Sequence, residues 1–357
     1  MGIVRVVRSS MKQYIRDMLI EEITAGELAV GKQLPSIREL AERFDTSISP
    51  VHQALEELEE QGYVIKKNGA GTFVADASSA LSLGETVALG LGTRAHVWGE
   101  LELLLARELS RVGLPPIIFD ASTPEGRERL TGLARSDTAA FVLHGRRGLP
   151  FEKLQSPLFR EKTIVGIVEW RGPEMENLVR VLSDFSAGGE MVADHLELRG
   201  HRKVLIVVPR MEQIEKEGGG FEHGRMFMRE WQKRGGDCSV IASEGWKDEM
   251  PIFDNGNLLS HFEGETDFPT AVFGLMDVES FAVQRLLRRE CPDRVNEVEF
   301  IGYYNTPWSR AGEPPFTSVD LNLEGLAERG GRALRKALLE DEPGGSLDYV
   351  RPKLVVR

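Results

Sequence analysis

The stretch LPSIRELAERFDTSISPVHQAL, residues 34–55, predicts two short helices joined by a tight turn. Ser36 and Glu39 have the spacing of a capping box, in which each side chain accepts a hydrogen bond from the other residue's backbone N–H. The second helix is expected to begin near Ser49 and to end at Gly62, which cannot easily continue it. Its apolar face is formed by Val51, Ala54, Leu55 and Leu58.

The segments on both sides of this helix pair complete a small domain. Residues 11–24 carry apolar side chains at helical spacing, and residues 63–74, YVIKKNGAGTFV, predict two short strands around an Asn-Gly turn. Three helices and a hairpin predict a compact α+β domain over residues 1–76. The small and polar residues 77–85 predict a linker, which leaves residues 86–357 as a second region.

Composition limits the class of protein. The chain has 357 residues, 41% of them apolar, and a net charge of −12, so no overall positive field attracts it to nucleic acid. Its two cysteines, Cys238 and Cys291, lack metal-ligand spacing and suit a reducing compartment. No apolar run approaches about 18 residues, the length that a membrane-spanning helix needs. We therefore expect a cytoplasmic protein with no membrane contact. We also expect no metal and no cofactor.

The second region alternates apolar strands with helices. TVALGLGT, AAFVLHG, KTIVGIVEW, KVLIVVP and TAVFGLM are examples of the strands. Continuous apolar strands that alternate with helices predict a parallel sheet covered on both faces. Since there are too many strands for one small sheet, we expect two α/β lobes.

A series of landmarks recurs through the first domain at consistent spacing. They are Gly26, Gly31, Leu34, Pro35, Ser36, Arg38, Glu39, Leu40, Ala41, Ala54, Leu55, Leu58, Gly62 and the predicted wing at Gly69–Val74. In these features residues 11–75 resemble the winged helix-turn-helix of the GntR family of transcriptional regulators. The resemblance implies that the second helix of the pair enters the major groove of operator DNA, with its N-terminal residues at the base edges.

Ten residues are DNA-binding candidates under this resemblance. They are Ser36, Arg38, Ser47, Ile48, Ser49, His52, Gln53, Lys66, Lys67 and Gly71. Ile48 can touch a thymine methyl group and Gln53 can read adenine, while the wing glycine lets the backbone approach the sugar-phosphate surface. Arg5 and Arg8 could form an additional arm.

The opening stretch departs from the family in its charge. Ile48 and His52 stand where GntR proteins usually carry arginine, and residues 1–76 hold 9 Lys and Arg against 12 Asp and Glu. We therefore expect DNA binding that is weaker than in a typical relative, or directed at a different sequence. Other interpretations remain open: Arg38 could pair with Glu42, the two lysines could be solvated, and the serines could be helix caps alone.

The second region resembles the LacI-type effector domain, which is related to periplasmic sugar-binding proteins. The resemblance covers roughly residues 86–357 and includes the stretches SDFSAGGEMVADHLELRGHRKVLIV, PTAVFGLMDVESFAVQRLLRR and EVEFIGYYNTPW. It implies a two-lobed, periplasmic-binding-protein-like α/β domain with a ligand between the lobes. The combination with a GntR head also occurs in bacterial arabinose repressors.

Polar and aromatic residues at the predicted strand ends are the effector-binding candidates. They are Trp98, Glu169, Asp184, Glu217, Asp277, Asn305 and Trp308. Carboxylates and amides can bind paired sugar hydroxyls, and an indole can stack on the C–H face of a sugar. Glu217 stands where relatives place a sugar-gripping arginine, which would also allow a cationic or amino ligand. The tryptophans could instead belong to the lobe cores, and Asp277 could merely cap a helix.

No catalytic motif supports an enzyme. The sequence contains no G-x-S-x-G or H-E-x-x-H motif and no phosphate loop, and GLGT alone is not a dinucleotide fingerprint. We therefore predict a ligand-responsive transcriptional repressor that binds operator DNA as a homodimer and responds to a small molecule, a sugar being the first expectation. The alternative is a small-molecule-binding protein whose DNA-binding head is decayed or serves partner contacts.

Overall fold

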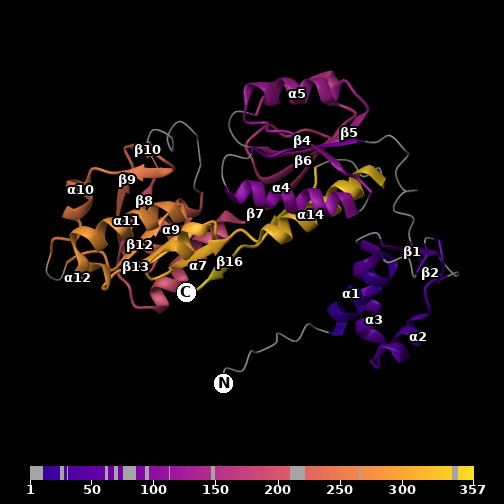
Figure 1. The fold of residues 1–357 in the computed structure, drawn as a ribbon, viewed down its shortest axis with the longest axis horizontal. Coiled ribbons are helices and arrows are strands. Elements are labelled where there is room, and N and C mark those ends of the chain that lie inside the picture. The colour runs from indigo at the N-terminus through magenta and orange to yellow at the C-terminus, as the bar shows by residue number, and fades with distance from the viewer. Residues whose placement is uncertain are drawn as a thin grey trace.

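The structure is a computed structural model that describes residues 11–24, 28–29, 31–60, 63–67, 71–74, 86–92, 96–111, 113–145, 149–209, 222–264, 267–339 and 345–357. Figure 1 shows a small N-terminal head and two larger α/β lobes. The expected linker, residues 77–85, and the candidate Glu217 lie outside the described residues, as do Arg5 and Arg8. None of the helices in the described part combines the length and apolar character that crossing a bilayer requires.

The head is a winged helix-turn-helix, as predicted. Its elements are α1 (Met11–Thr24), α2 (Ile37–Arg43), α3 (Ile48–Glu60), β1 (Val64–Lys67) and β2 (Gly71–Val74). The apolar face of α3 packs against α1 and α2 around a core of its own. Buried in that core are Ile15, Leu19, Leu34, Leu40, Val51, Ala54, Leu55, Leu58, Val64 and Val74.

The wing has a third strand-like segment that pattern alone did not indicate. Residues 31–34 run beside β2, and the Leu34 N–H donates to the Thr72 carbonyl at 2.8 Å. Gly71 has a φ of +108°, and a Cβ there would lie 2.5 Å from the Gln33 amide nitrogen. The wing therefore needs glycine at this position for its conformation, since the exposed Gln33 side chain could move aside.

Lobe I is built on a six-stranded parallel sheet. The strand order is β15-β7-β6-β5-β3-β4. The strands are β3 (Thr86–Gly90), β4 (Pro116–Ile118), β5 (Thr138–Gly145), β6 (Thr163–Trp170), β7 (Leu178–Ser183) and β15 (Leu347–Val350). Helices α4 (His96–Arg111) and α14 (Leu323–Leu339) pack together on one face, and α5 (Pro124–Ala134) and the short α6 (Phe151–Leu154) belong to the other.

Lobe II holds the second six-stranded sheet, in the order β16-β14-β13-β12-β8-β9. Its strands are β8 (Lys203–Val208), β9 (Asp237–Ala242), β12 (Ala271–Gly274), β13 (Glu299–Tyr303), β14 (Thr317–Asp320) and β16 (Lys353–Val355), which is antiparallel to β14. Its main helices are α7 (Phe185–Leu198), α9 (Glu222–Lys233) and α11 (Asp277–Glu290). Shorter elements are α10 (Asn255–Ser260), α12 (Pro292–Val295), α13 (Pro307–Ala311) and the hairpin of β10 (Gly245–Lys247) and β11 (Met250–Ile252).

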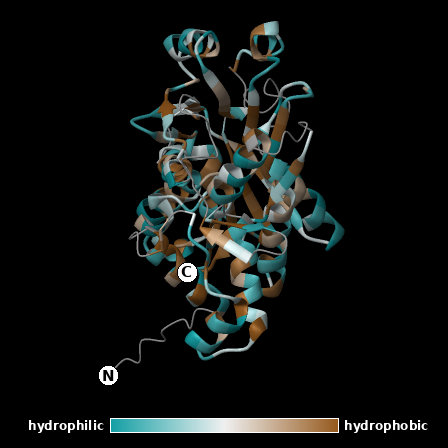
Figure 2. Cartoon of the chain, turned by 90° about the vertical axis from the view of Figure 1, so that its right-hand side faces the viewer, coloured by the Kyte–Doolittle hydropathy of each residue, from teal (hydrophilic) through white to brown (hydrophobic). Residues whose placement is uncertain are grey.

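The chain crosses between the lobes three times. It passes from β7 into α7, from β14 into α14, and from β15 into β16. The crossings are tied to one another, because the Asp184 N–H donates to the Val350 carbonyl at 2.9 Å and the Asn322 amide donates to the Arg351 carbonyl at 3.4 Å. In Figure 2 the apolar residues concentrate on the strands inside the lobes, where continuous burial was expected.

A partly buried cluster around Glu299 fixes α7 to the lobe II sheet. The carboxylate of Glu299, at the start of β13, lies 2.7 Å from His195 Nε2 and 2.8 Å from His201 Nε2. Arg199 also donates to it at 3.2 Å. Burial opposes ionisation of Glu299, but the bonds from the two histidines outweigh it and hold the pKa of this carboxyl far below its usual range.

We expect Glu299→Gln to lower the free energy of unfolding of lobe II by about 2 kcal/mol, because hydrogen bonds to a charged group are lost and two ring nitrogens are left poorly paired. Urea unfolding followed by tryptophan fluorescence measures the change. Glu297→Gln is the matched control, since Glu297 is exposed and bonds only Arg294 among the described residues. Equal stability of both variants would show that the cluster does not hold α7.

Candidate functional site

The start of α3 presents an exposed face of polar and apolar residues. Ser47, Ile48, Ser49, His52 and Gln53 are all exposed, while Val51, Ala54 and Leu55 of the same helix are buried. Ile48 keeps 51% of its surface exposed, so its side chain is free to make a contact outside the head. This face has the position that a recognition helix requires.

Ser36 acts as the N-cap of α2. Its hydroxyl accepts from the Glu39 N–H at 3.3 Å, and the Ser36 N–H donates to the Glu39 carboxylate at 2.7 Å. The predicted capping box is therefore confirmed. The hydrogen bonds from the Ser36 backbone and side chain lower the pKa of Glu39.

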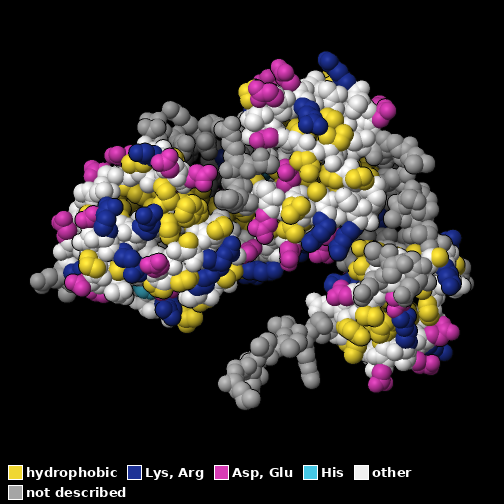
Figure 3. Space-filling model, viewed as in Figure 1, with side chains coloured by type: hydrophobic (Ala, Val, Ile, Leu, Met, Phe, Trp, Pro, Cys, Tyr) yellow, Lys and Arg dark blue, Asp and Glu magenta, His cyan; other side chains and the backbone are white. Residues whose placement is uncertain are grey.

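Most cations of the head are neutralised by nearby carboxylates. Among the described residues, Lys12, Arg16, Arg43 and Lys66 each form an ion pair within the head. His52 Nδ1 lies 3.3 Å from Glu56, and Lys67 sits 4.9 Å from the centre of the Phe73 ring. On the face seen in Figure 3, basic and acidic side chains are correspondingly interspersed over the head.

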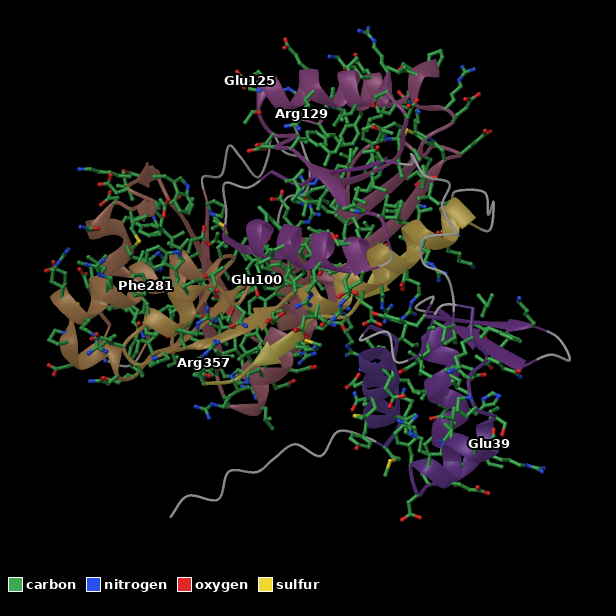
Figure 4. The ribbon with its side chains drawn as sticks, turned by 45° about the vertical axis from the view of Figure 1, so that its right-hand side comes forward. Glu39, Glu100, Glu125, Arg129, Phe281 and Arg357 are labelled. Carbon is green, nitrogen blue, oxygen red and sulfur yellow. The ribbon has the colours of Figure 1, made fainter. Side chains whose placement is uncertain are left out.

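Arg38 differs from these cations. It is exposed on α2, and in the described part of the chain no hydrogen bond or ion pair to it is recorded, including the pair with Glu42 that its spacing allowed. Figure 4 labels its neighbour Glu39, whose side chain lies at the outer end of the head. Among the described residues Arg38 is thus an exposed guanidinium with no carboxylate partner.

Trp98 lies where the two lobes meet. It is on the first turn of α4, is only 8% exposed, and its ring centre lies 4.6 Å from that of His144 at the end of β5. The same indole lies 5.9 Å from the ring of Tyr304, which belongs to lobe II. The aromatic candidate of lobe I is therefore in position to contact a ligand between the lobes.

Glu169, near the end of β6, is next to this aromatic group. Its carboxylate lies 3.2 Å from His144 Nε2 and accepts two hydrogen bonds from Arg171, at 2.8 and 2.9 Å. Burial alone would raise the pKa of Glu169, but the contacts with His144 and Arg171 outweigh it and lower the pKa to about 2. The group is therefore an ionised hydrogen-bond acceptor across the physiological range.

Two candidate carboxylates are engaged in the fold. Asp184 caps α7, since its side chain accepts from the Ala187 N–H at 2.9 Å. Asp277 is 0% exposed, and it accepts from the hydroxyls of Thr306 at 2.8 Å and Ser318 at 2.6 Å, as well as from the Thr306 N–H. Burial is the largest influence on Asp277 and raises its pKa to about 7.

Asn305 and Trp308, the two candidates that follow β13, contact other residues of lobe II. The Asn305 amide donates to Asp320 at 2.8 Å and accepts from Arg357 at 2.5 Å; Arg357 is labelled in Figure 4. Trp308 packs 5.0 Å from Phe281 in a core cluster that belongs to lobe II alone. Trp308 thus takes the core position that had been its alternative interpretation.

The structure adds two residues that the sequence argument passed over. His223 of α9 stacks on Tyr303 at 3.9 Å and lies 6.1 Å from Tyr304, while its Nε2 donates to the Leu275 carbonyl at 3.1 Å. Burial lowers its pKa to about 4, so the ring is neutral at pH 7. Tyr304 had a signal in the sequence, because it stands directly before Asn305 in the turn that ends β13.

Comparisons with known proteins match two separate parts of the chain. The gntR family of bacterial regulatory proteins matches residues 11–74, and a periplasmic binding protein-like domain matches residues 193–357. An arabinose metabolism transcriptional repressor from Geobacillus stearothermophilus is 34% identical over 358 residues, which cover 96% of this chain and 95% of that repressor. The chain belongs to the gntR family of transcriptional regulators.

Solved structures resemble the two-lobed part of this regulator. A LacI family regulator from Enterococcus faecalis with bound ribose gives a TM-score of 0.59 at 17% identity, covering 76% of this chain and 97% of that one. A periplasmic binding protein/LacI regulator from Alkaliphilus metalliredigens complexed with D-xylulofuranose gives 0.58 at 16%, covering 76% and 98%. At these identities the likeness establishes the fold, which is the predicted periplasmic-binding-protein-like α/β architecture.

The arrangement suits binding better than catalysis. At the lobe contact Trp98, His144, His223 and Tyr304 contribute rings, and Glu169 contributes an ionised carboxylate that is paired with Arg171. Rings and a charged acceptor can stack on a small molecule and bind its hydroxyl or amino groups. Its relatives by sequence are regulators, which agrees with this chemistry.

We expect Arg38→Ala to weaken operator binding about tenfold, since one arginine contact to guanine contributes about 1–3 kcal/mol. Fluorescence anisotropy with labelled operator DNA measures the loss. Arg107→Ala is the control, because Arg107 is an exposed arginine of lobe I with the same charge. If both variants lost the same small amount, the Arg38 guanidinium would contribute only through net charge.

A second expectation concerns the pH dependence of stability through Asp277. A carboxyl whose folded pKa is raised stabilises the fold fully below its unfolded pKa, and this stability is lost as pH rises toward 7. Asp277→Asn cannot titrate, so its free energy of unfolding relative to wild type should rise by about 2 kcal/mol from pH 5 to pH 8. Urea unfolding at the two pH values tests this, with Asp267→Asn, which removes an exposed carboxylate of the same lobe, as the control. A constant difference would mean that the Asp277 carboxyl has an ordinary pKa.

Proposed function

We propose that this protein is a transcriptional repressor whose operator binding is controlled by a small molecule, a sugar, bound between its two α/β lobes. The observation that carries the proposal is the 34% identity to the arabinose metabolism repressor across 96% of the chain, head and lobes together. This function requires no catalytic step and places the protein in the cytoplasm with its DNA. The domains that we assign are the head at residues 1–76, the linker at 77–85 and the effector domain at 86–357.

Operator recognition is assigned to the head. The exposed first turn of α3 would lie in the major groove, with Ile48 against a thymine methyl group and Gln53 at an adenine. Arg38 supplies a cation close by, and Ser47 and Ser49 are exposed hydroxyls at the helix start. Lys66, Lys67 and Gly71 place the wing on the adjacent backbone. A homodimer would present two heads to the half-sites of a near-palindromic operator.

Effector recognition is assigned to the lobe contact. Trp98 offers an indole for the C–H face of a sugar ring, and the ionised Glu169 offers an acceptor for its hydroxyl groups. The partly exposed Tyr304 adds an aromatic ring to this lining, and the buried His223 lies behind it. Asp184, Asp277 and Asn305 then support the site indirectly, because their side chains fix the crossing segments and the β13 turn around it.

A second function is favoured by one feature, the internal pairing of the head's cations. Four of its described lysines and arginines are bound to carboxylates, which reduces what the head can offer to phosphates. On this alternative the protein binds its small molecule as proposed, and the head contacts a partner protein instead of DNA. Salt dependence separates the two functions, since phosphate contacts release counterions and partner contacts do not do so in the same way.

The experiment is fluorescence anisotropy of the full chain against DNA from its own upstream region, with scrambled DNA as control, over a salt series. A repressor should prefer the specific DNA and lose affinity steeply as salt rises, with a slope of about −0.9 per phosphate neutralised. Pentoses, hexoses and amino sugars are then added to the complex, and the effector is the compound that changes the anisotropy at constant DNA. No preference over scrambled DNA at any salt, for this or a genome-selected operator, would reject the repressor in favour of the second function.

A further inference from the structure

The turn after β13 holds an aromatic residue in an unusual backbone conformation. Tyr304 has a φ of +88° and Asn305 a φ of +49°, a region in which bulky residues are rare. Such outliers persist only where the surroundings fix them, and they cluster at sites of ligand binding and switching. The conformation of this turn therefore calls for a functional reason.

Two elements of lobe II, β14 and α11, fix the turn. The Tyr304 N–H donates to the Val319 carbonyl at 2.7 Å, and the Asn305 N–H donates to the Ser318 hydroxyl at 3.0 Å. One residue later, the Thr306 hydroxyl donates to the buried Asp277 at 2.8 Å. Since successive residues are bound in this way, the turn cannot relax to an ordinary φ without breaking buried hydrogen bonds.

The consequence of this fixed turn is a contact between the lobes. The Tyr304 ring meets the Trp98 indole edge to face, with ring centres 5.9 Å apart and an interplanar angle of 75°. Each partner is supported within its own lobe, Trp98 by His144 at 4.6 Å and Tyr304 by His223 at 6.1 Å. Trp98 is 8% exposed and Tyr304 is partly buried, so the contact is partly shielded from water.

We propose that Trp98 and Tyr304 form a latch that holds the two lobes together without any effector. Edge-to-face rings attract each other beyond the apolar area that they bury, and here the two rings belong to different lobes, so their attraction favours only the closed arrangement. The latch determines what fraction of the protein is already closed before an effector binds. This inference concerns the free protein and stands apart from the proposed regulation.

The test is a distance measurement between the lobes in the full-length protein without ligand. Spin labels are placed at Glu128→Cys on α5 of lobe I and Asn255→Cys on α10 of lobe II, both exposed, in a Cys238→Ser, Cys291→Ser background. Double electron–electron resonance then gives the inter-lobe distance distribution. Tyr304→Ala should raise the open population relative to the closed one about two- to tenfold, which is the range expected for one aromatic pair.

Companion variants separate the ring from the backbone. Tyr304→Phe keeps the ring and should keep the closed distribution. Tyr304→Gly loses the ring while its backbone tolerates a positive φ, so it should open the lobes as Tyr304→Ala does but unfold at a higher temperature. Tyr349→Ala is the matched control, because Tyr349 is an exposed tyrosine on β15.

The partner side of the latch gives an independent result. Trp98→Ala should open the lobes to the same extent, and the double variant should open them no further than either single variant, since both remove one interaction. An unchanged distribution in Tyr304→Ala would overturn the latch, as would additive opening in the double variant or a wild-type distribution in Tyr304→Gly. None of these readouts uses DNA or a sugar, so failure of the repressor assay would leave the result intact.

Discussion

The buried carboxylate of Asp277 is the interaction on which the organisation of lobe II depends. It lies at the start of α11, directly after β12, and accepts hydrogen bonds from Thr306 after β13 and from Ser318 in β14. One side chain thus joins the ends of three neighbouring strands at the edge of the sheet that faces lobe I. The close approach leaves no room for a side chain at Gly302, where a Cβ would lie 2.0 Å from the Asp277 carboxylate. The turn of Tyr304 and Asn305 has its conformation because this carboxylate and Ser318 hold both of its ends.

In the head, charged side chains are paired within the domain, and the apolar core holds the helices and the wing together. Four of its described lysines and arginines lie beside carboxylates of the same domain, and the exposed start of α3 carries serines, an isoleucine, a histidine and a glutamine. A helix of this composition can read a groove by methyl contact and amide hydrogen bonds, with few charges for phosphate. Such a head would gain less from electrostatic attraction and would depend more on the operator sequence than a head rich in arginine.

Sequence patterns predicted the elements well because their causes are local. The Ser36 and Glu39 capping box depends only on a spacing of three residues. The continuous apolar runs of β5, β6 and β8 predict strands buried on both faces, whatever their neighbours in the sheet are. The hairpin of β10 and β11 was not predicted, because its short strands carry no alternating pattern. The third segment of the wing was missed for a similar reason, since its pairing with β2 depends on residues about 40 positions away.

The site was harder to predict because its roles depend on partners that are distant in sequence. Asp277 and Asn305 were selected as polar residues after strands, yet Ser318, Asp320 and Arg357 engage them from later elements. Trp98 and Trp308 had equivalent local settings, and only the packing of the lobes separates a residue at the lobe contact from one in the core.

His223 and Tyr304 each adopt a state that costs free energy. A tyrosine at positive φ is costly by about 1–3 kcal/mol, and a buried histidine must give up its charge. Both residues lie near the place where a ring of lobe II contacts Trp98 of lobe I. His223 belongs to the interior of lobe II, where it stacks on Tyr303 and donates to the Leu275 carbonyl, so its neutral state follows from that burial. Tyr304 is only partly buried and its ring reaches Trp98 of the other lobe, so its backbone conformation is better explained by the contact between the lobes.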